Sequence, residues 1–206
     1  MVLRSRPGLN SFADFLELVS EDQKADLLDG VIYMASPENI EHGRLIAWLA
    51  KILGCFVEER QLGEVTLNRI AYRLSPKDSP EPDVAFLRTD RSSIIKHGYV
   101  DGPPDLAVEV VSPESVERDY EQKRDRYERA GVGEYWIIDP DEKRATLLTL
   151  VETPGTAPAY REAALDGTIF RSKVVPGFVL DVNWFWQRPL PPALKTVQSM
   201  LAKDAP

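Results

Sequence analysis

Glu109 has the residue type and the position of a buried catalytic or metal-binding carboxylate. It lies in the middle of the run Leu106 to Val111, which is apolar on both faces and therefore predicts a central strand covered by helices. Burying an unpaired carboxylate is costly, so Glu109 requires a partner there. The alternative is an edge strand or a solvent-facing position, where a lone glutamate needs none.

Lys123 is the partner that the spacing indicates. Residues four and three positions apart share one face of a helix, and that face should contact the sheet: Val116, Tyr120, Lys123, Tyr127 and Ala130. A lysine on this face can pair with a buried carboxylate on the preceding strand. It can also cover apolar surface with its stem and keep its amine in water.

Asp83 is the third candidate, because Glu81-Pro82 precedes it and an apolar strand follows. Proline fixes φ and removes a donor, so the carboxylate is presented at the start of the strand. If the strands of Asp83 and Glu109 are neighbours, two carboxylates converge into an oxygen site suited to Mg²⁺ or Mn²⁺. A nearby lysine could then hold a hydroxide nucleophile or stabilise the charge that builds on a phosphate.

Other metal chemistry is excluded by residue counts. The chain of 206 residues has one cysteine, Cys55, and two histidines, so neither a thiolate zinc site nor an imidazole cluster is available. His42 could still reach the same cleft from the start of a long helix, or it could be an ordinary hydrogen-bonded histidine. Trp136 is expected in the core, and the Ser112 to Ser115 segment is expected to shape a turn.

The elements that must position these residues alternate between helix and strand patterns. Ser11 can cap a short helix, and Asp29-Gly30 indicates a hairpin. Asn39 precedes a five-turn amphipathic helix, and Gly131 ends a second helix. The predicted strands are 65–74, 83–87, 105–111, 134–139 and 145–151, the last two forming a hairpin. The order predicts an α+β fold, with a central mixed β-sheet flanked by helices.

Composition limits the partners. The chain is 43% hydrophobic and 28% charged, as expected for one globular domain. It has no apolar run long enough for a membrane span and no signal-peptide pattern, so we expect a cytoplasmic protein that contacts no membrane. The net charge is −8, which argues against tight nucleic-acid binding by the whole surface.

Several short motifs match one known family. They are Glu81 to Ala85, Pro104 to Pro113, Asp119, Lys123, Tyr127, Ala130 to Val132 and Glu134 to Pro140, with Leu28 to Gly30, Ser36-Pro37, Glu41-His42 and Pro176 to Phe178 outside that stretch. Across residues 20–182 the chain resembles the Uma-two family of restriction-endonuclease-like proteins, in the PD-(D/E)XK nuclease superfamily.

The resemblance implies catalytic roles for Asp83, Glu109 and Lys123, and a Mg²⁺ or Mn²⁺ ion held by Asp83, Glu109 and the backbone carbonyl of Val110. The superfamily lysine is absent from the strand, where Val111 stands two positions after Glu109, and Lys123 on the following helix takes its place. Asp26 and His42 are auxiliary candidates. Asp26 stands where many relatives carry a supporting glutamate.

The resulting expectation is a metal-dependent endonuclease acting on DNA, with a nuclease-like domain at residues 1–188 and a Pro-rich C-terminal tail at 189–206. A homodimer is expected by analogy with nucleases that cut two strands.

The alternative function is that of an inactive nuclease fold that serves as a binding or assembly module, which the acidic balance favours. Hydrolysis of another phosphoester remains open. A DNA-facing edge could be formed by the basic residues of the second helix, Arg118, Lys123, Arg124, Arg126 and Arg129. Arg124 and Arg126 could instead pair with Asp119, Glu121 and Glu128.

Overall fold

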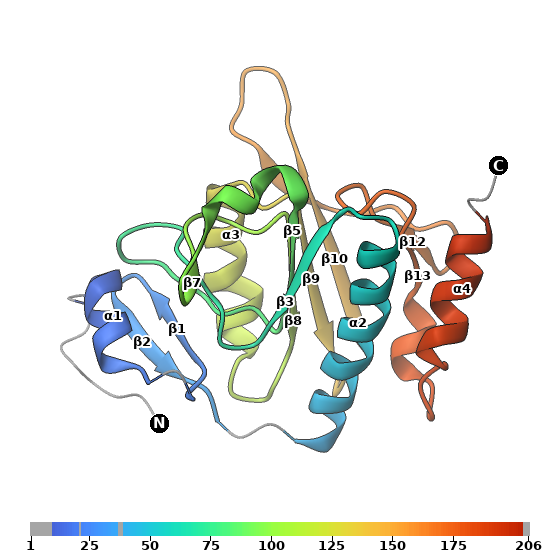
Figure 1. Cartoon of the computed structure of the whole chain (residues 1–206), viewed down its shortest axis with the longest axis horizontal. Helices are drawn as coiled ribbons and strands as arrows, with labels where there is room; N and C mark the ends of the chain where they lie inside the picture. Colours follow the sequence, from blue (N-terminus) through green and yellow to red (C-terminus); the bar gives the residue numbers. More distant parts are fainter. Residues whose placement is uncertain (1–9, 21, 37–38, 204–206) are drawn as a thin grey trace.

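A six-stranded mixed sheet forms the centre of the molecule (Figure 1). The computed structural model describes residues 10–20, 22–36 and 39–203. In the sheet order β11-β10-β9-β8-β5-β3, only β8 and β9 pair in parallel. The strands are β3 (Gly63–Leu67), β5 (Val84–Arg88), β8 (Leu106–Val110), β9 (Glu134–Asp139), β10 (Arg144–Val151) and β11 (Ala159–Glu162). The predicted fold class is confirmed.

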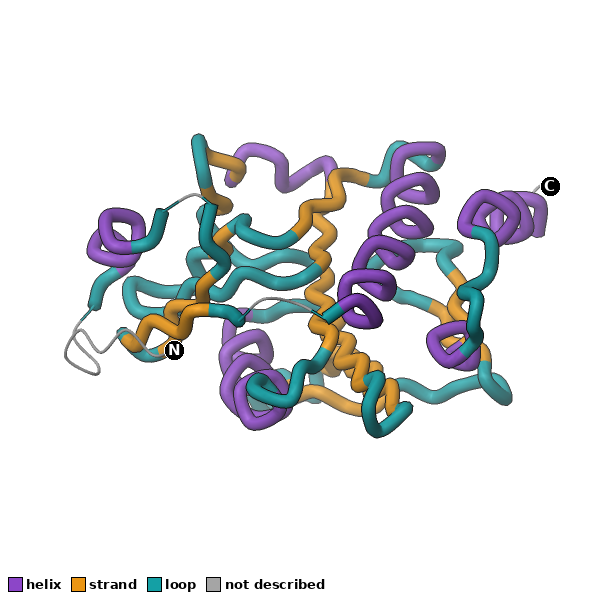
Figure 2. The backbone as a smooth tube through the Cα atoms, turned by 90° about the horizontal axis from the view of Figure 1, so that it is seen from below, coloured by secondary structure: helices purple, strands orange, loops and turns teal. Residues whose placement is uncertain are grey.

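One long helix covers one face of this sheet. In α2 (Ile40–Glu59) the apolar residues recur at helical spacing, and Asn39 caps the helix by accepting the amide N–H of His42 at 2.9 Å. Its buried side chains join one core cluster with the residues of β8 that point the same way: Leu106, Val108 and Val110. The tube view in Figure 2 shows α2 lying along the sheet.

The opposite face is covered by the helical segment that follows β8. It consists of a π-helical part, η2 (Arg118–Lys123), and α3 (Arg124–Ala130), which ends at Gly131 with φ of 82°. Ala107 and Val111 pack against Tyr127 in a second cluster. Because side chains alternate along a strand, Glu109 points to this same face, toward the helix.

The π-helical part changes which residues of the segment are buried. The inward positions are Ser115, Asp119, Lys123 and Tyr127, each four residues apart. The prediction was right for Lys123 and Tyr127 but wrong for Val116, which is 45% exposed. A π turn accommodates one extra residue, so the inward face upstream of Lys123 moves by one position. This places Asp119 inside.

A small N-terminal unit lies beside the sheet, at the left of Figure 1. The helix α1 (Phe12–Leu18) has a capping box between Ser11 and Asp14, and the hairpin of β1 (Ala25–Leu28) and β2 (Val31–Met34) was predicted. Asp29 and Gly30 have positive φ, as a tight hairpin turn requires. The unit is attached through a bridge between Leu27 and Ser79.

The predicted strand 65–74 is interrupted. β3 ends at Leu67, and the chain turns through Arg69, which has a φ of 68°. A separate small sheet then contains β4 (Ala71–Tyr72), β7 (Tyr99–Val100) and β6 (Ile95–Lys96). The short helix η1 (Thr89–Ile94) connects β5 to β6. The turn separates residues that the apolar pattern alone had joined.

The C-terminal region packs beside α2 (Figure 1). It comprises β12 (Ile169–Arg171), β13 (Val179–Asp181), η3 (Val182–Trp186) and α4 (Ala193–Lys203). Trp184 and Trp186 pack against the main core cluster. Within the segment predicted as a Pro-rich tail, 189–206, the helix α4 is part of the core, because its Val197 and Met200 are buried in the main cluster. The ends of the two predicted regions, 1–9 and 204–206, lie outside the described residues.

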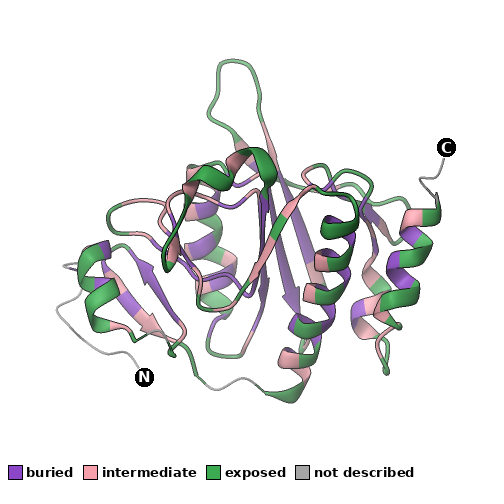
Figure 3. Ribbon diagram, viewed as in Figure 1, coloured by how far each residue is buried: buried purple, intermediate pink, exposed green. Residues whose placement is uncertain are grey.

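The burial pattern agrees with this layered arrangement, since the central strands are almost wholly buried while the outer helices are mixed (Figure 3). None of the helices in the described ranges combines the length and apolar character needed to cross a membrane. The boundary predicted between a nuclease-like domain at residues 1–188 and a tail at 189–206 stays a prediction.

Candidate active site

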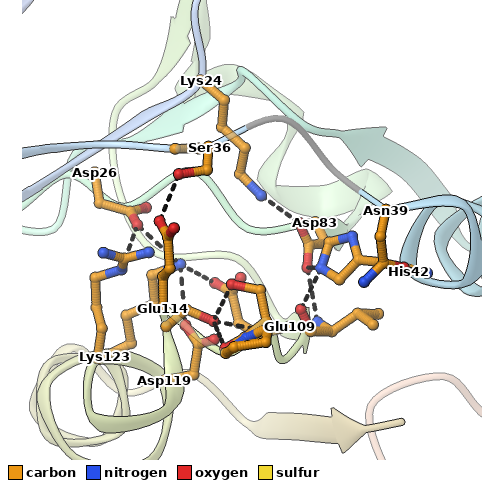
Figure 4. Close-up of a pocket in the computed structure, with 16 residues that line it drawn as sticks. Lys24, Asp26, Ser36, Asn39, His42, Asp83, Glu109, Glu114, Asp119 and Lys123 are labelled. Carbon is orange, nitrogen blue, oxygen red and sulfur yellow. Dashed lines mark hydrogen bonds and ion pairs between the residues drawn. The ribbon is translucent and has the colours of Figure 1, made fainter. Parts of the chain in front are cut away.

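A pocket lies where the N-terminal hairpin, the start of α2 and the end of β8 meet the π-helical segment (Figure 4). Its lining includes every side chain predicted for the site: Asp26, His42, Asp83, Glu109 and Lys123. Val110 and the Ser112 to Ser115 turn also line it. The sequence therefore identified residues that the fold does bring together, while their roles stay predictions.

Glu109 and Lys123 form the predicted buried contact. The Lys123 Nζ lies 2.9 Å from Glu109 Oε1, and both side chains are at most 3% exposed. Tyr127, one helical turn further along, donates its hydroxyl to the same oxygen at 3.1 Å. The edge-strand alternative for Glu109 and the exposed alternative for the Lys123 amine are both wrong.

Lys123 also contacts two further carboxylates. Its Nζ is 3.1 Å from Asp26 Oδ2 and 3.5 Å from Asp119 Oδ1. Burial alone would lower the pKa of Lys123, but the charges of Asp26, Glu109 and Asp119 outweigh burial and raise it well above its ordinary value. The amine is therefore a fixed positive charge and cannot serve as a proton acceptor at neutral pH.

Asp83 stands immediately before β5, next to β8. The register that pairs Val84 with Val108 brings Asp83 beside Glu109. Asp83 Oδ2 accepts the backbone N–H of Val110 at 2.7 Å, and the amine of Lys24 contacts Asp83 Oδ1. The two carboxylates thus converge from neighbouring strands, as expected.

His42 reaches the pocket from the first turn of α2. Its Nε2 lies 2.5 Å from the carbonyl oxygen of Val110 and 3.8 Å from Asp83 Oδ2. The ring is buried, so this hydrogen bond ties the start of α2 to the end of β8. The sequence left two alternatives for His42, a residue of the cleft or an ordinary hydrogen-bonded histidine. In the structure His42 is both.

The buried acids titrate differently according to their neighbours. Burial raises the pKa of Glu109 to about 8, with the charges of Asp83 and Asp119 adding to the effect and Lys123 opposing it. Burial also raises the pKa of Asp119. For Asp26 burial acts in the same direction, but Lys123, Arg118 and Lys24 together outweigh it and lower its pKa. Asp26 is therefore the firmly ionised partner of Lys123.

Lys24 and Asp119 belong to the pocket but were not predicted as site residues. Lys24 precedes β1 in a polar stretch, and a lysine there is usually exposed, so no signal marked it. Asp119 stood one position off the predicted inward face, and only the π-helical turn moves it inward. Asp119 did occur among the family-like motifs, which was the available signal.

The basic residues of the second helix are mostly engaged with acids. Arg118 Nε lies 3.4 Å from Asp26 Oδ2, and Arg126 Nε donates to Asp78 at 2.6 Å, not to Glu121, Glu128 or Asp119 as expected. Arg129 pairs with Asp125. A free DNA-facing edge on this helix is therefore smaller than the sequence suggested.

The oxygen donors at this pocket fit a hard divalent cation. Among the residues that the structure describes, no group of three or more His, Cys, Asp or Glu side chains forms a ready metal centre. An ion would take Asp83, Glu109 and the Val110 carbonyl, with water completing its coordination. Lys24 and His42 already contact two of these donors, so neutralising groups stand where an ion would bind.

Two of three comparisons with known proteins gave matches. A family model, Uma2, described as "Putative restriction endonuclease", matches residues 12–183. A crystal structure of a "putative nuclease belonging to DUF820" from Anabaena variabilis is similar over 93% of this chain and 98% of its own, with 16% identity and a TM-score of 0.64. At that identity the likeness concerns the fold. No curated protein matched the chain.

Proposed function

Because the chain belongs to the Uma2 family, with its nuclease-like function, we propose that it is a Mg²⁺- or Mn²⁺-dependent endonuclease that hydrolyses phosphodiester bonds of DNA. The observation that carries the proposal is the buried contact between Lys123 and Glu109 beside Asp83. Two convergent carboxylates and a fixed ammonium group form a constellation suited to phosphoryl transfer, where positioning and charge stabilisation dominate.

In this proposal Asp83, Glu109 and the Val110 carbonyl hold the ion, and Lys123 acts through its charge. A bound divalent ion would polarise a phosphate oxygen and acidify a water molecule. The Lys123 ammonium would hold the attacking oxygen in line and offset the negative charge that develops on the phosphate. Asp26 and Asp119 are positioning residues, since they contact Lys123 and fix its amine.

His42 would support the site from the other side. By holding the Val110 carbonyl at 2.5 Å it fixes the end of β8, which carries Glu109. Ser112 to Ser115 serve the turn that follows: the Ser115 hydroxyl accepts the N–H of Ser112 at 2.9 Å, which favours a structural role over a nucleophilic one. Homodimer formation and a cytoplasmic location remain expectations of the sequence.

The experiment is cleavage of plasmid, linear duplex and single-stranded DNA with Mg²⁺ or Mn²⁺ at low salt. Glu109→Gln and Lys123→Met should each lose at least about 99% of the cutting rate, because both remove charge stabilisation from the transition state. Low salt is needed because an acidic protein contacts few phosphates, and salt weakens those contacts. Glu109→Gln should stay folded, because the amide keeps the shape of the side chain and its oxygen can still accept hydrogen bonds from Lys123 and Tyr127.

Matched controls are Glu59→Gln and Lys51→Met, which make the same chemical changes at exposed positions of α2. Both should cut like the wild type. Equal cutting by Glu109→Gln and the wild type would contradict the proposal and indicate a contaminating nuclease. A wild type that binds DNA without cutting any substrate would favour the alternative function, a binding or assembly module with a nuclease fold.

A further inference from the structure

Lys24 is a second lysine at the pocket, and it is partly buried. It immediately precedes β1, and its side chain is 18% exposed. Its amine contacts Asp83 Oδ1 and lies 3.2 Å from Asn68 Oδ1. Figure 4 shows the Lys24 side chain reaching into the pocket toward Asp83, apart from the group around Lys123. The two lysines therefore serve different carboxylates.

The distribution of charge explains why a lysine is needed at this place. Asp26, Glu109 and Asp119 share the amine of Lys123, and Arg118 adds a further contact to Asp26. Lys123 makes no such contact with Asp83. Asp83 is 1% exposed, and its own contacts are the Val110 N–H, the His42 ring and Lys24. Without Lys24, a buried carboxylate would lack a close full positive charge.

The same contact conflicts with ion binding. The Lys24 amine lies on an oxygen of the carboxylate that the proposed function assigns to a divalent cation. An ammonium group has no lone pair to offer the ion, and two positive charges within a few ångströms repel each other strongly in a buried site. A flexible four-carbon stem lets the amine withdraw without any change in the backbone.

We propose that Lys24 is a built-in counter-ion that neutralises Asp83 when no divalent cation is bound, and that it competes with the cation for this carboxylate. Lys24 thereby sets the affinity of the site for divalent cations and keeps the ion-free pocket folded. This inference rests on the proposed function, because it concerns the ligand assigned there.

The test is calorimetric titration of Mn²⁺ into the wild type and into Lys24→Met, which keeps an unbranched side chain one atom shorter and removes the charge. Lys24→Met should bind Mn²⁺ about tenfold or more tightly, because the competing charge is gone. Lys51→Met, which removes an exposed charge from α2, should change the affinity less than about twofold.

Thermal melts give a second readout that is independent of cutting. With EDTA, Lys24→Met should melt below the wild type, and at saturating Mn²⁺ the difference should shrink, since the ion replaces the lost counter-ion and stabilises the native state. If Lys24→Met does not fold, Lys24→Gln replaces it, because the amide still donates to Asp83 and Asn68. The same tighter binding is expected of that variant.

Equal or weaker Mn²⁺ binding by the folded Lys24 variant would overturn the inference. If Asp83→Asn then abolishes binding in the wild-type background, the proposed ion site survives and only the role of Lys24 is lost. If the wild type binds no Mn²⁺ at all, both the ion site and the inference fail.

Discussion

At the level of single residues, each buried carboxylate that lines the pocket has its negative charge offset by a particular lysine. Lys123 compensates Asp26, Glu109 and Asp119, while Lys24 compensates Asp83. Glu81 differs, because its Oε2 accepts the N–H of Ala25 at 3.0 Å and no ion pair to it is seen in the described residues. Burial therefore dominates there and raises the pKa of Glu81 to about 8.

Glu81→Gln should change how stability depends on pH. The unfolded chain releases the Glu81 proton near pH 4.5, whereas the folded protein keeps it until about pH 8, so wild-type stability falls as the pH rises between these values. The slope from this one group is at most about 1.4 kcal/mol per pH unit. Glutamine mimics the protonated acid, so Glu81→Gln should gain stability over the wild type across this window.

The measurement is urea unfolding from pH 4.5 to pH 8.5 with EDTA present. Glu59→Gln, at an exposed position of α2, serves as the control and should follow the wild type at every pH. A difference between Glu81→Gln and the wild type that does not vary with pH would mean that Glu81 is ionised throughout.

At the scale of elements, the π-helical turn η2 decides which acid accompanies Lys123. In a regular α-helix each four-residue step overshoots a full turn by about 40°, so the steps from Tyr127 back through Lys123 would carry Asp119 about 80° away from Tyr127 and leave Tyr120 on the inward face. The extra residue of the π turn instead aligns Ser115, Asp119, Lys123 and Tyr127. Such turns are frequent at functional sites, and this one delivers a carboxylate to the amine that the proposed reaction uses.

Deleting Glu121, an exposed residue of η2, should convert the π turn into regular α-helix. Residues before the deletion would rotate by about 100°, which removes Asp119 from Lys123. We expect a folded protein with a lower melting temperature and at least about tenfold slower DNA cutting. Circular dichroism melts and the cleavage assay measure both effects.

Glu121→Ala is the matched control for the deletion, since it removes the same side chain and keeps the chain length. It should melt and cut like the wild type. Normal cutting by the deletion variant would show that the position of Asp119 has no bearing on activity.

At the scale of the whole molecule, the C-terminal region belongs to the same packed structure as the candidate active site. The helix α4 lies beside α2, and its buried Val197 and Met200 share one core cluster with Leu49 and Trp136 (Figures 1 and 2). α4 therefore covers one flank of α2, while Lys51 and Cys55 on the outer face of α2 stay exposed.

Met200→Ala should destabilise the protein by about 2–5 kcal/mol, as large-to-small changes in a core do. Leu194→Ala, at a 69% exposed position of the same helix, should cost less than about 0.5 kcal/mol. Urea unfolding measures both values. A negligible effect of Met200→Ala would show that α4 is detached in solution.

The sequence by itself determined the features that depend on short range. Ser11 and Asn39 define helix starts through caps, and the run around Glu109, which is apolar on both faces, predicts a central strand. The partnership of Glu109 with Lys123 also followed from the sequence, because a strand and the next helix pack together and leave few inward positions. These inferences need only local geometry, which residue spacing encodes directly.

Only the tertiary structure decided which distant residues complete the pocket. Lys24 meets Asp83 across 59 positions of sequence, and Asp26 reaches Lys123 from the hairpin that a bridge to Ser79 attaches. Periodicity shows that a side chain faces inward but not which element it will face. The extra residue of the π turn has no signature in the apolar spacing either, which predicted a regular helix through Lys123. The sequence indicated which charged residues are buried. Which residues they pair with depends on the packing of distant elements.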